Sequence, residues 1–491
     1  MLDHCLPCHL PLSPDPSPAR GEGRISPSRR RFFVSLAATL LLTACAVGPD
    51  YVKPDAPTPQ AYKEANGWQP ATPQDDLPRG NWWAVFGDAT LDDLMRRVDI
   101  DNYTIQIAEA RYRQARELTA QAGAALWPTV GASVGKTRAR SGADTGIRNS
   151  HSAMLSAAWE LDVWGGLRRS REAASAAEEA SAADFEAARL AARAQLAASY
   201  FQLRALDAQQ QLLTETTQAY ERALQITRNR LASGVVTPAD VAQADSQLQS
   251  ARASLLDSGL SRAQTEHAIA LLVGKAPADF ALAAGPLSET APEVPAGLPS
   301  TLLQRRPDIA AAERRMAAAN ARIGVAVAAF FPSLTLGAQG GYQSPTFADW
   351  LTLPNRIWSF GPQLAATLFD AGARSAAKRG AEAAWDAEVA TYRQTVLAAF
   401  QEVEDNLVAL RVLAEEQQVQ QAARDAANTS LTIVSNQYRA GTVSYLDVVQ
   451  AQTTLLNAEN TLLNIRNRRL AASVGLIKAV GGGWEVAEAA E

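Results

Sequence analysis

Side chains of two kinds alternate along Ser152-Ala153-Met154-Leu155-Ser156-Ala157-Ala158-Trp159-Glu160-Leu161-Asp162-Val163. Successive side chains of a β-strand point to opposite faces, so its period of two predicts a strand. The odd-numbered residues form an apolar face, while the even-numbered residues are mostly polar or small. Segments of about ten residues that are apolar on one side are typical of transmembrane barrels. A sandwich of strands covered by helices is the alternative that the pattern leaves open.

Three further segments extend this pattern. Residues 357–369 alternate in the same way and place on their apolar face Trp358, Phe360, Leu364, Ala366 and Leu368. Two shorter runs follow Pro128 and Pro332 and open the two predicted hairpins: Val130/Ala132/Val134 and Leu334/Leu336/Ala338. Four strands cannot close a barrel, because the smallest barrels have about eight. Since open sheet edges are not tolerated in lipid, several chains are expected to share one barrel.

Very long helices are predicted between the strands and after them. Residues 167–231 contain no proline and consist largely of good helix formers, which gives a helix of roughly 100 Å at 1.5 Å per residue. A seam with spacings of three and four residues runs along it through Leu203, Leu206, Gln210, Leu213, Thr217, Tyr220, Leu224, Thr227 and Leu231. This spacing, which Val396, Phe400, Val403, Leu407 and Leu410 repeat in the second half, predicts coiled-coil packing.

The chain is predicted to contain an internal repeat. Residues 126–130 correspond to residues 330–334 at an offset of 204, and residues 229–248 correspond to residues 436–455 at an offset of 207. The second match shares Gly234/Gly441, Asp240/Asp447, Val241/Val448, Gln243/Gln450 and Ala244/Ala451. Each half is therefore expected to contain a helix, two strands, a very long helix, a turn and another long helix.

An export signal precedes these halves. Arg29-Arg30-Arg31 is followed by an apolar run over residues 32–42 and by Thr43-Ala44-Cys45, which is the order of a signal peptide. The ending resembles the bacterial lipobox, in which the cysteine is lipidated and becomes the new N-terminus. We therefore expect a covalent lipid on Cys45 and no other cofactor; an ordinary signal peptide is the alternative. Ala46 in place of aspartate favours the outer membrane.

Composition excludes several classes of function. The formal charge is −5, and becomes −7 without residues 1–44, so no cationic excess is available for nucleic acid. After cleavage the chain keeps one cysteine, together with His151 and His267, too few for the usual metal or disulfide frameworks. Because it also lacks a Gly-x-Ser-x-Gly elbow and a phosphate-binding loop, the chain is not expected to be an enzyme.

Several motifs together resemble a known family. Following the predicted lipid-bearing cysteine is Gly48-Pro49-Asp50-Tyr51-Val52-Lys53-Pro54, and later come Trp82-Trp83-Ala84-Val85-Phe86-Gly87-Asp88, Arg305-Arg306-Pro307-Asp308-Ile309 and Ala440-Gly441-Thr442-Val443-Ser444-Tyr445-Leu446-Asp447. This ordered set resembles the TolC-like outer-membrane factors, in particular the NodT/OprM-like lipoprotein branch that serves resistance–nodulation–division (RND) efflux pumps. The likeness covers nearly the whole chain after the signal.

The resemblance implies an α+β membrane protein that forms a homotrimer, with a β-barrel of 12 strands and a periplasmic coiled-coil tunnel of 12 helices. It implies passive conduction, with an inner-membrane RND pump supplying the energy and a periplasmic membrane-fusion adaptor bridging the two. The alternative is a lipid-anchored periplasmic coiled-coil adaptor or scaffold that does not span the membrane.

The predicted domain boundaries follow from the repeat and the resemblance. Residues 1–44 form an N-terminal extension and signal peptide, and residues 45–87 a lipid-anchored part of the equatorial region. The first and second repeats span residues 88–273 and 301–479. Residues 274–300 link them, and residues 480–491 form the C-terminal tail.

Family members close the periplasmic end with acidic residues at the helix tips. Carried over by position, Asp447 is a candidate gate residue and Asp240 is its partner in the other repeat. Both also fit the acidic position of a capping box, after Thr237 and Ser444. The basic partner that the family places at position 443 is valine here, so the closed state cannot use that ion pair.

The turns next to these acids are the candidate adaptor-contacting tips, formed by Ser233, Gly234, Val235, Gly441, Thr442 and Val443. Their glycines readily adopt a positive φ, so a purely structural role in the turn is the alternative.

Overall fold

The computed structural model describes residues 46–55, 63, 81–140, 146–288, 291–292 and 306–482. The chain divides into two units, Met1–Cys45 and Ala46–Glu491, of which the first, including the predicted lipidation site Cys45, lies outside the described residues. Most of the predicted tail 480–491 and part of the predicted linker 274–300 also lie outside them.

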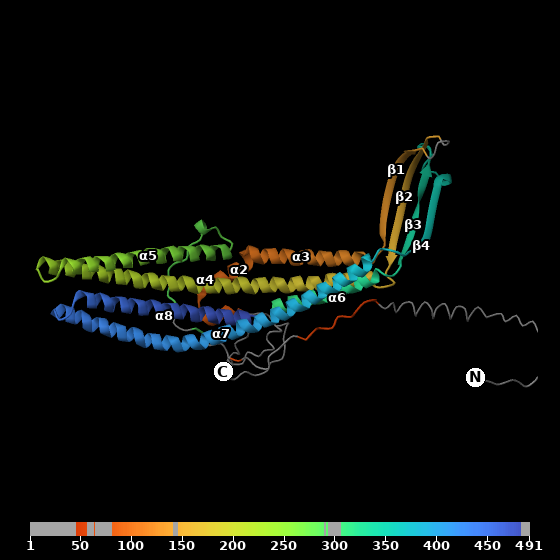
Figure 1. Ribbon diagram of the computed structural model, residues 1–491. Coiled ribbons are helices and arrows are strands. Elements are labelled where there is room, and N and C mark those ends of the chain that lie inside the picture. Colours follow the sequence, from red (N-terminus) through yellow and green to blue (C-terminus); the bar gives the residue numbers. More distant parts are fainter. Residues whose placement is uncertain are drawn as a thin grey trace, which may run out of the picture. The chain divides into compact units, whose positions relative to one another are not determined.

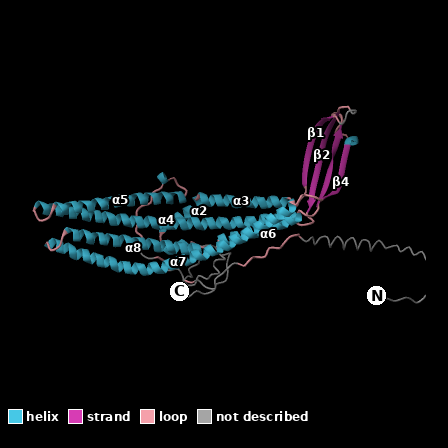
Figure 2. Cartoon of the chain, in the orientation of Figure 1, coloured by secondary structure: helices cyan, strands magenta, loops and turns pink. Residues whose placement is uncertain are grey.

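Helices make up most of the second unit (Figures 1 and 2). Two helices are very long, α4 (Gly166–Ala232) with 67 residues and α7 (Ala373–Ala440) with 68, and each turns back into a helix of 35 residues, α5 (Pro238–Leu272) or α8 (Tyr445–Ala479). The shorter helices α2 (Ala89–Asp101), α3 (Tyr103–Ala124) and α6 (Pro307–Ala328) pack against these, mainly against α4. The helix predicted over residues 167–231 is confirmed to within one residue at each end.

The predicted coiled-coil seam is also confirmed. Seven of its nine positions on α4 are buried, so its period of three and four does mark the packed face. Two of these, Thr217 and Thr227, donate their hydroxyl protons to the carbonyl oxygens of Leu213 and Ala223, which satisfies their polar groups within the helix. None of the helices in the described part of the chain combines the length and apolar character that crossing a bilayer requires.

Four antiparallel strands form one sheet in the order β1-β2-β3-β4. They are β1 (Thr129–Ala139), β2 (Arg148–Leu161), β3 (Ser333–Ser344) and β4 (Arg356–Ala365). The register aligns the predicted apolar faces across all four strands, as in the row Val130, Ala157, Ala338 and Phe360. Strands β2 and β3 join the two halves of the chain, and β1 and β4 are the edges.

Two strands end earlier than the sequence pattern predicts. β4 stops at Ala365, so Ala366, Leu368 and Phe369 lie outside it. Its neighbour β3 begins at Ser333, which pairs with Ala365, and the preceding Pro332 has no N–H to extend the ladder. β2 stops at Leu161, where the chain turns and the Val163 N–H donates to the Leu161 carbonyl oxygen at 2.8 Å. The Asp162 carboxylate then accepts hydrogen bonds from the backbone N–H groups of Leu167 and Arg168 at 3.0 and 2.8 Å.

The segment that follows the predicted lipid-bearing cysteine lies against α4 and α6. The Val47 N–H donates to the carbonyl oxygen of Trp164 at 3.1 Å. The side-chain amide of Asn320 donates to the carbonyl oxygen of Pro49, also at 3.1 Å. The buried Arg169 pairs with Asp50 at 2.7 Å. These contacts fix residues 47–50 beside the junction between the helices and the sheet.

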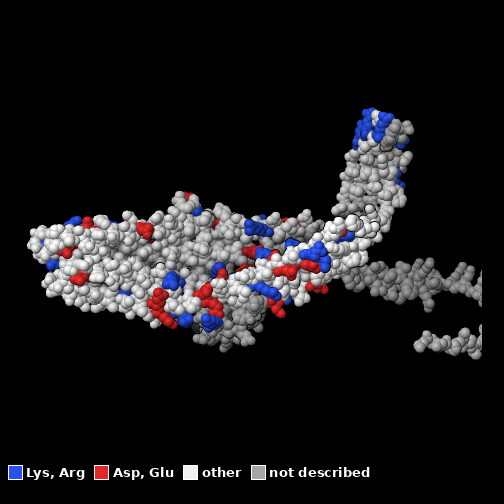
Figure 3. All heavy atoms as spheres, viewed as in Figure 1, with Lys and Arg blue, Asp and Glu red and all other residues white. Residues whose placement is uncertain are grey.

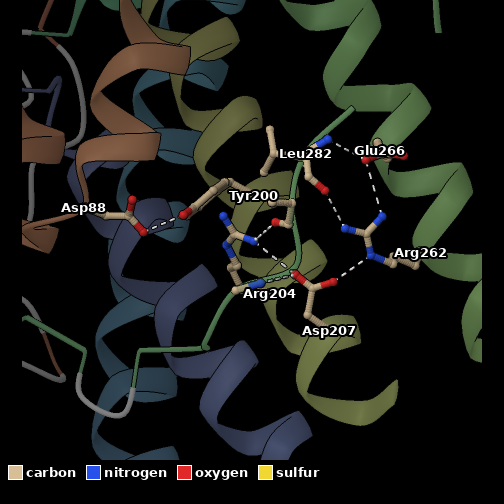
Figure 4. A network of polar contacts seen from close by, with 9 residues as sticks. Asp88, Tyr200, Arg204, Asp207, Arg262, Glu266 and Leu282 are labelled. Carbon is tan, nitrogen blue, oxygen red and sulfur yellow. Dashed lines mark hydrogen bonds and ion pairs between the residues drawn. The ribbon is translucent and has the colours of Figure 1, made fainter. Parts of the chain in front are cut away.

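A buried polar network fixes the segment after α5 to the helix bundle (Figure 4). Asp207 accepts hydrogen bonds from Arg262 at 2.6 Å, Arg204 at 3.1 Å and the backbone N–H of Gly285 at 3.1 Å. The two guanidinium groups also donate to the carbonyl oxygens of Leu282 and Ala283, at 2.8 and 2.7 Å. We call Arg204, Asp207 and Arg262 the strap network, because they hold residues 280–285 against α4 and α5.

Candidate functional site at the helix tips

The first helix tip, between α4 and α5, is a glycine turn. At its centre Gly234 has a φ of +69°. The backbone N–H groups of Gly234 and Val235 donate to the carbonyl oxygens of Leu231 and Arg230, both at 2.9 Å, which satisfies the end of α4.

The second tip, between α7 and α8, has the same construction. Gly441 has a φ of +79°, and the N–H of Thr442 donates to the carbonyl oxygen of Gln437 at 3.0 Å. A Cβ atom added at Gly234 or Gly441 would meet no atom within 4 Å. Glycine is therefore required at both positions by backbone conformation and not by crowding.

Both predicted capping boxes are confirmed. Asp240 Oδ2 accepts from the N–H and the hydroxyl of Thr237 at 2.8 and 2.9 Å. In the same way Asp447 Oδ2 accepts from the N–H and the hydroxyl of Ser444 at 2.9 and 2.6 Å. The hydrogen bonds to Asp447, above all the one from the Ser444 hydroxyl, hold the pKa of its carboxyl below the ordinary value.

The two acids do not meet within the chain. Among the described residues neither Asp240 nor Asp447 pairs with the other or with a cation, and each carboxylate is used by the cap of its own helix. Asp447 is exposed and Asp240 half-buried. One protomer therefore presents two separate anionic caps at neighbouring tips, and their part in a gate stays a prediction.

Sequence reasoning missed the contacts that join the two tips. The guanidinium of Arg230 on α4 lies 4.4 Å from the ring centroid of Tyr438 on α7, and donates to the Tyr438 carbonyl oxygen at 3.1 Å. The Tyr438 and Tyr445 rings pack 5.4 Å apart within a buried cluster that also contains Tyr220. The two aromatic residues that flank the second turn, Tyr438 and Tyr445, indicate a buried core at the tip. No pattern in the sequence around Arg230 indicates that it contacts the other helix pair.

Exposure at the tips partly departs from the prediction. Ser233, Gly234, Val235, Gly441 and Thr442 are exposed. Val443 instead is partly buried, because its aliphatic side chain packs against the buried cluster that contains Tyr438 and Tyr445. Leu446, which the sequence did not single out, is 60 % exposed and adds an apolar side chain to the tip.

Histidine and acidic residues gather nowhere in the pattern of a metal site within the described ranges. His151 lies in β2, where its ring packs 5.4 Å from Phe347. Its place in the strand follows from the register, which pairs it with Lys136 and Ser344.

Comparison with known proteins agrees with this architecture. The family model described as outer membrane efflux protein matches the chain twice, over residues 95–275 and 298–482. The chain is 33 % identical over 462 residues to the probable efflux pump outer membrane protein TtgC of Pseudomonas putida, covering 92 % of this chain and 96 % of TtgC. It is 34 % identical over 467 residues to the pyoverdine export outer membrane protein OpmQ of Pseudomonas aeruginosa, covering 92 % and 96 %.

A solved structure shares the fold as well. The outer membrane channel CmeC of Campylobacter jejuni superimposes with a TM-score of 0.84 at 25 % identity, over 90 % of this chain and 96 % of CmeC. The chain therefore belongs to the outer membrane efflux protein family and is an outer-membrane channel component of an efflux pump.

Proposed function

We propose that three copies of this chain form one channel, in which each contributes four strands to a 12-stranded barrel and four helical segments to a periplasmic tunnel of 12 helices. The observation that carries the proposal is the four-stranded sheet with two edges, β1 and β4. Pairing β4 of one chain with β1 of the next closes the sheet without leaving an edge in lipid. A closed ring of identical contacts is the usual symmetry of such assemblies.

The two faces of the sheet fit this arrangement. On the apolar face Val134, Trp358 and Leu364 are each more than two thirds exposed in the single chain. The opposite face carries small and polar residues such as Gly135, Ser152 and Gln363. We assign the apolar face to lipid and the opposite face to the lumen of the barrel.

We further propose that the channel is passive and not an enzyme. A covalent lipid on Cys45 anchors it and no other cofactor is involved. A periplasmic membrane-fusion adaptor meets the tips at Ser233, Gly234, Val235, Gly441, Thr442 and Val443, and an inner-membrane RND pump supplies the energy. Asp240 and Asp447 ring the periplasmic constriction. The double match of the family model supports an internal duplication as the origin of the two hairpins.

The transported class is proposed from relatives. TtgC and OpmQ are named for efflux and for pyoverdine export, so the cargo proposed for this channel is small organic molecules handed over by the pump.

Labelling of single cysteines in intact cells tests this function. Ala348 is exposed in the segment between β3 and β4 and Ser233 is exposed at a helix tip. A membrane-impermeant maleimide should modify A348C in intact cells, and S233C only after the outer membrane is opened. Equal protection of both sites, with no heat-modifiable oligomer on gels, would favour the non-spanning adaptor or scaffold.

A further inference from the structure

Three cations lie on the apolar face of the sheet, at the end away from the helices. Lys136 and Arg138 continue the face of β1 that begins with Val130, since all three are even-numbered residues of one strand. Arg356 shares that face, because the register aligns it with Tyr342, Ala153 and Val134. We call Lys136, Arg138 and Arg356 the rim cations.

The rim cations are available for an external partner. All three are exposed, and within the described residues none of their side chains has an ion-pair or hydrogen-bond partner. Lys136 lines a hollow of about 570 Å³, together with His151, Phe347 and Trp350. The Phe347 and Trp350 rings stack with centroids 5.8 Å apart, so the hollow has an aromatic wall beside a cation.

The charge of this end opposes that of the whole chain. Residues 136–148 and 342–356 contain five Lys or Arg and two Asp, whereas the whole chain carries −5. Figure 3 shows basic side chains gathered at the free end of the sheet. Toward this end the apolar strand face gives way to aromatic rings and unpaired cations, which are the groups that suit the interface and the anionic head groups of a lipid monolayer.

We propose that the rim cations and their aromatic hollow bind a phosphorylated glycolipid of the outer leaflet, the lipid A class. Its acyl chains would lie on the apolar face, its phosphates would contact Lys136, Arg138 and Arg356, and its sugar ring would cover the Phe347–Trp350 wall. Guanidinium and ammonium groups suit phosphate through charge-assisted hydrogen bonds. This inference rests on the proposed function, because it needs the sheet to span the outer membrane with this end outward.

Native mass spectrometry of the detergent-purified oligomer, titrated with bisphosphorylated lipid A, tests the proposal. Each cation near an anionic lipid surface contributes roughly fivefold in affinity, so K136Q/R138Q/R356Q should bind on the order of a hundredfold more weakly. R138Q and R148Q form a matched pair. Both remove one arginine at the same end of the sheet, but Arg148 lies on the opposite face. Only R138Q should weaken binding.

Unchanged affinity in the triple variant, or equal losses in R138Q and R148Q, would overturn the proposal. If the triple variant does not assemble, wild-type protein is titrated with lipid A from which the phosphates have been removed. Affinity equal to that of the bisphosphorylated lipid overturns it as well. Channel conductance and external A348C labelling of the same preparations test the proposed function separately, since either can persist when lipid binding fails.

Discussion

Replacing Asp207 by alanine should destabilise this protein strongly, because it leaves the buried Arg204 without a carboxylate partner and removes one of the two carboxylates that pair with Arg262 (Figure 4). The Asp207 side chain is 2 % exposed, and its partners Arg204 and Arg262 are 8 % and 17 % exposed. Removing one member of a buried ion pair usually costs about 3–5 kcal/mol, because the remaining charge has neither partner nor water. D207N should lose most of the same stability, since an amide accepts a hydrogen bond but does not neutralise the guanidinium groups.

A surface pair in the same two helices provides the matched control. Glu221 on α4 pairs with Arg252 on α5 at 2.6 Å, but both side chains are nearly half exposed. E221A should therefore cost only about 0–1 kcal/mol.

Two measurements on the purified oligomer check this difference: the midpoint of thermal unfolding and hydrogen–deuterium exchange. D207A should lower the midpoint far more than E221A does. It should also speed exchange in residues 280–285, whose backbone groups bond to the strap network. Equal midpoints for D207A and E221A, or unchanged exchange in that segment, would show that Asp207 does not hold residues 280–285 in place.

Three further predictions concern the tips and alkaline stability. D447A should raise single-channel conductance in planar bilayers, while unchanged conductance removes Asp447 from the gate. G441V should abolish adaptor crosslinking while oligomers stay intact, because a β-branched residue resists the φ of +79°; loss of the oligomer itself would favour a purely structural turn. Burial, followed by the hydrogen bond to Asp88, raises the pKa of Tyr200 to about 12 in the folded state. Since the phenol of the unfolded chain ionises near pH 10, the free energy of unfolding should fall as the pH rises from 10 to 12. Urea titrations at each pH measure this fall, which should be less steep in Y200F. The same dependence on pH in both proteins would contradict this.

Local patterns in the sequence predicted the helices and the caps. The period that buries Leu203, Leu213 and Tyr220 is contained within α4 itself, and each capping box needs only two residues three positions apart. Interactions of this range depend little on the rest of the fold, so they can be predicted before the fold is known.

Long-range pairing could not be predicted in the same way. Arg204 and Asp207 look like an ordinary surface pair on one helix, and only packing brings Arg262 and Gly285 to the same carboxylate. The early end of β4 depends likewise on where its partner β3 begins. Arg230 gains its role from an aromatic ring that is 208 residues away in the sequence.

If the two edges of the sheet close between neighbouring chains, interchain disulfides between β1 and β4 should form. A cysteine at Ser133 on β1 is paired in turn with cysteines at positions 357, 359, 361 and 363 of β4, which share the face assigned to the lumen. A disulfide needs Cα atoms within about 7 Å, so it reports direct strand pairing. We expect at least one pairing to give covalent trimers and nothing larger. Monomers from every pairing, in protein that is correctly exported, would contradict it.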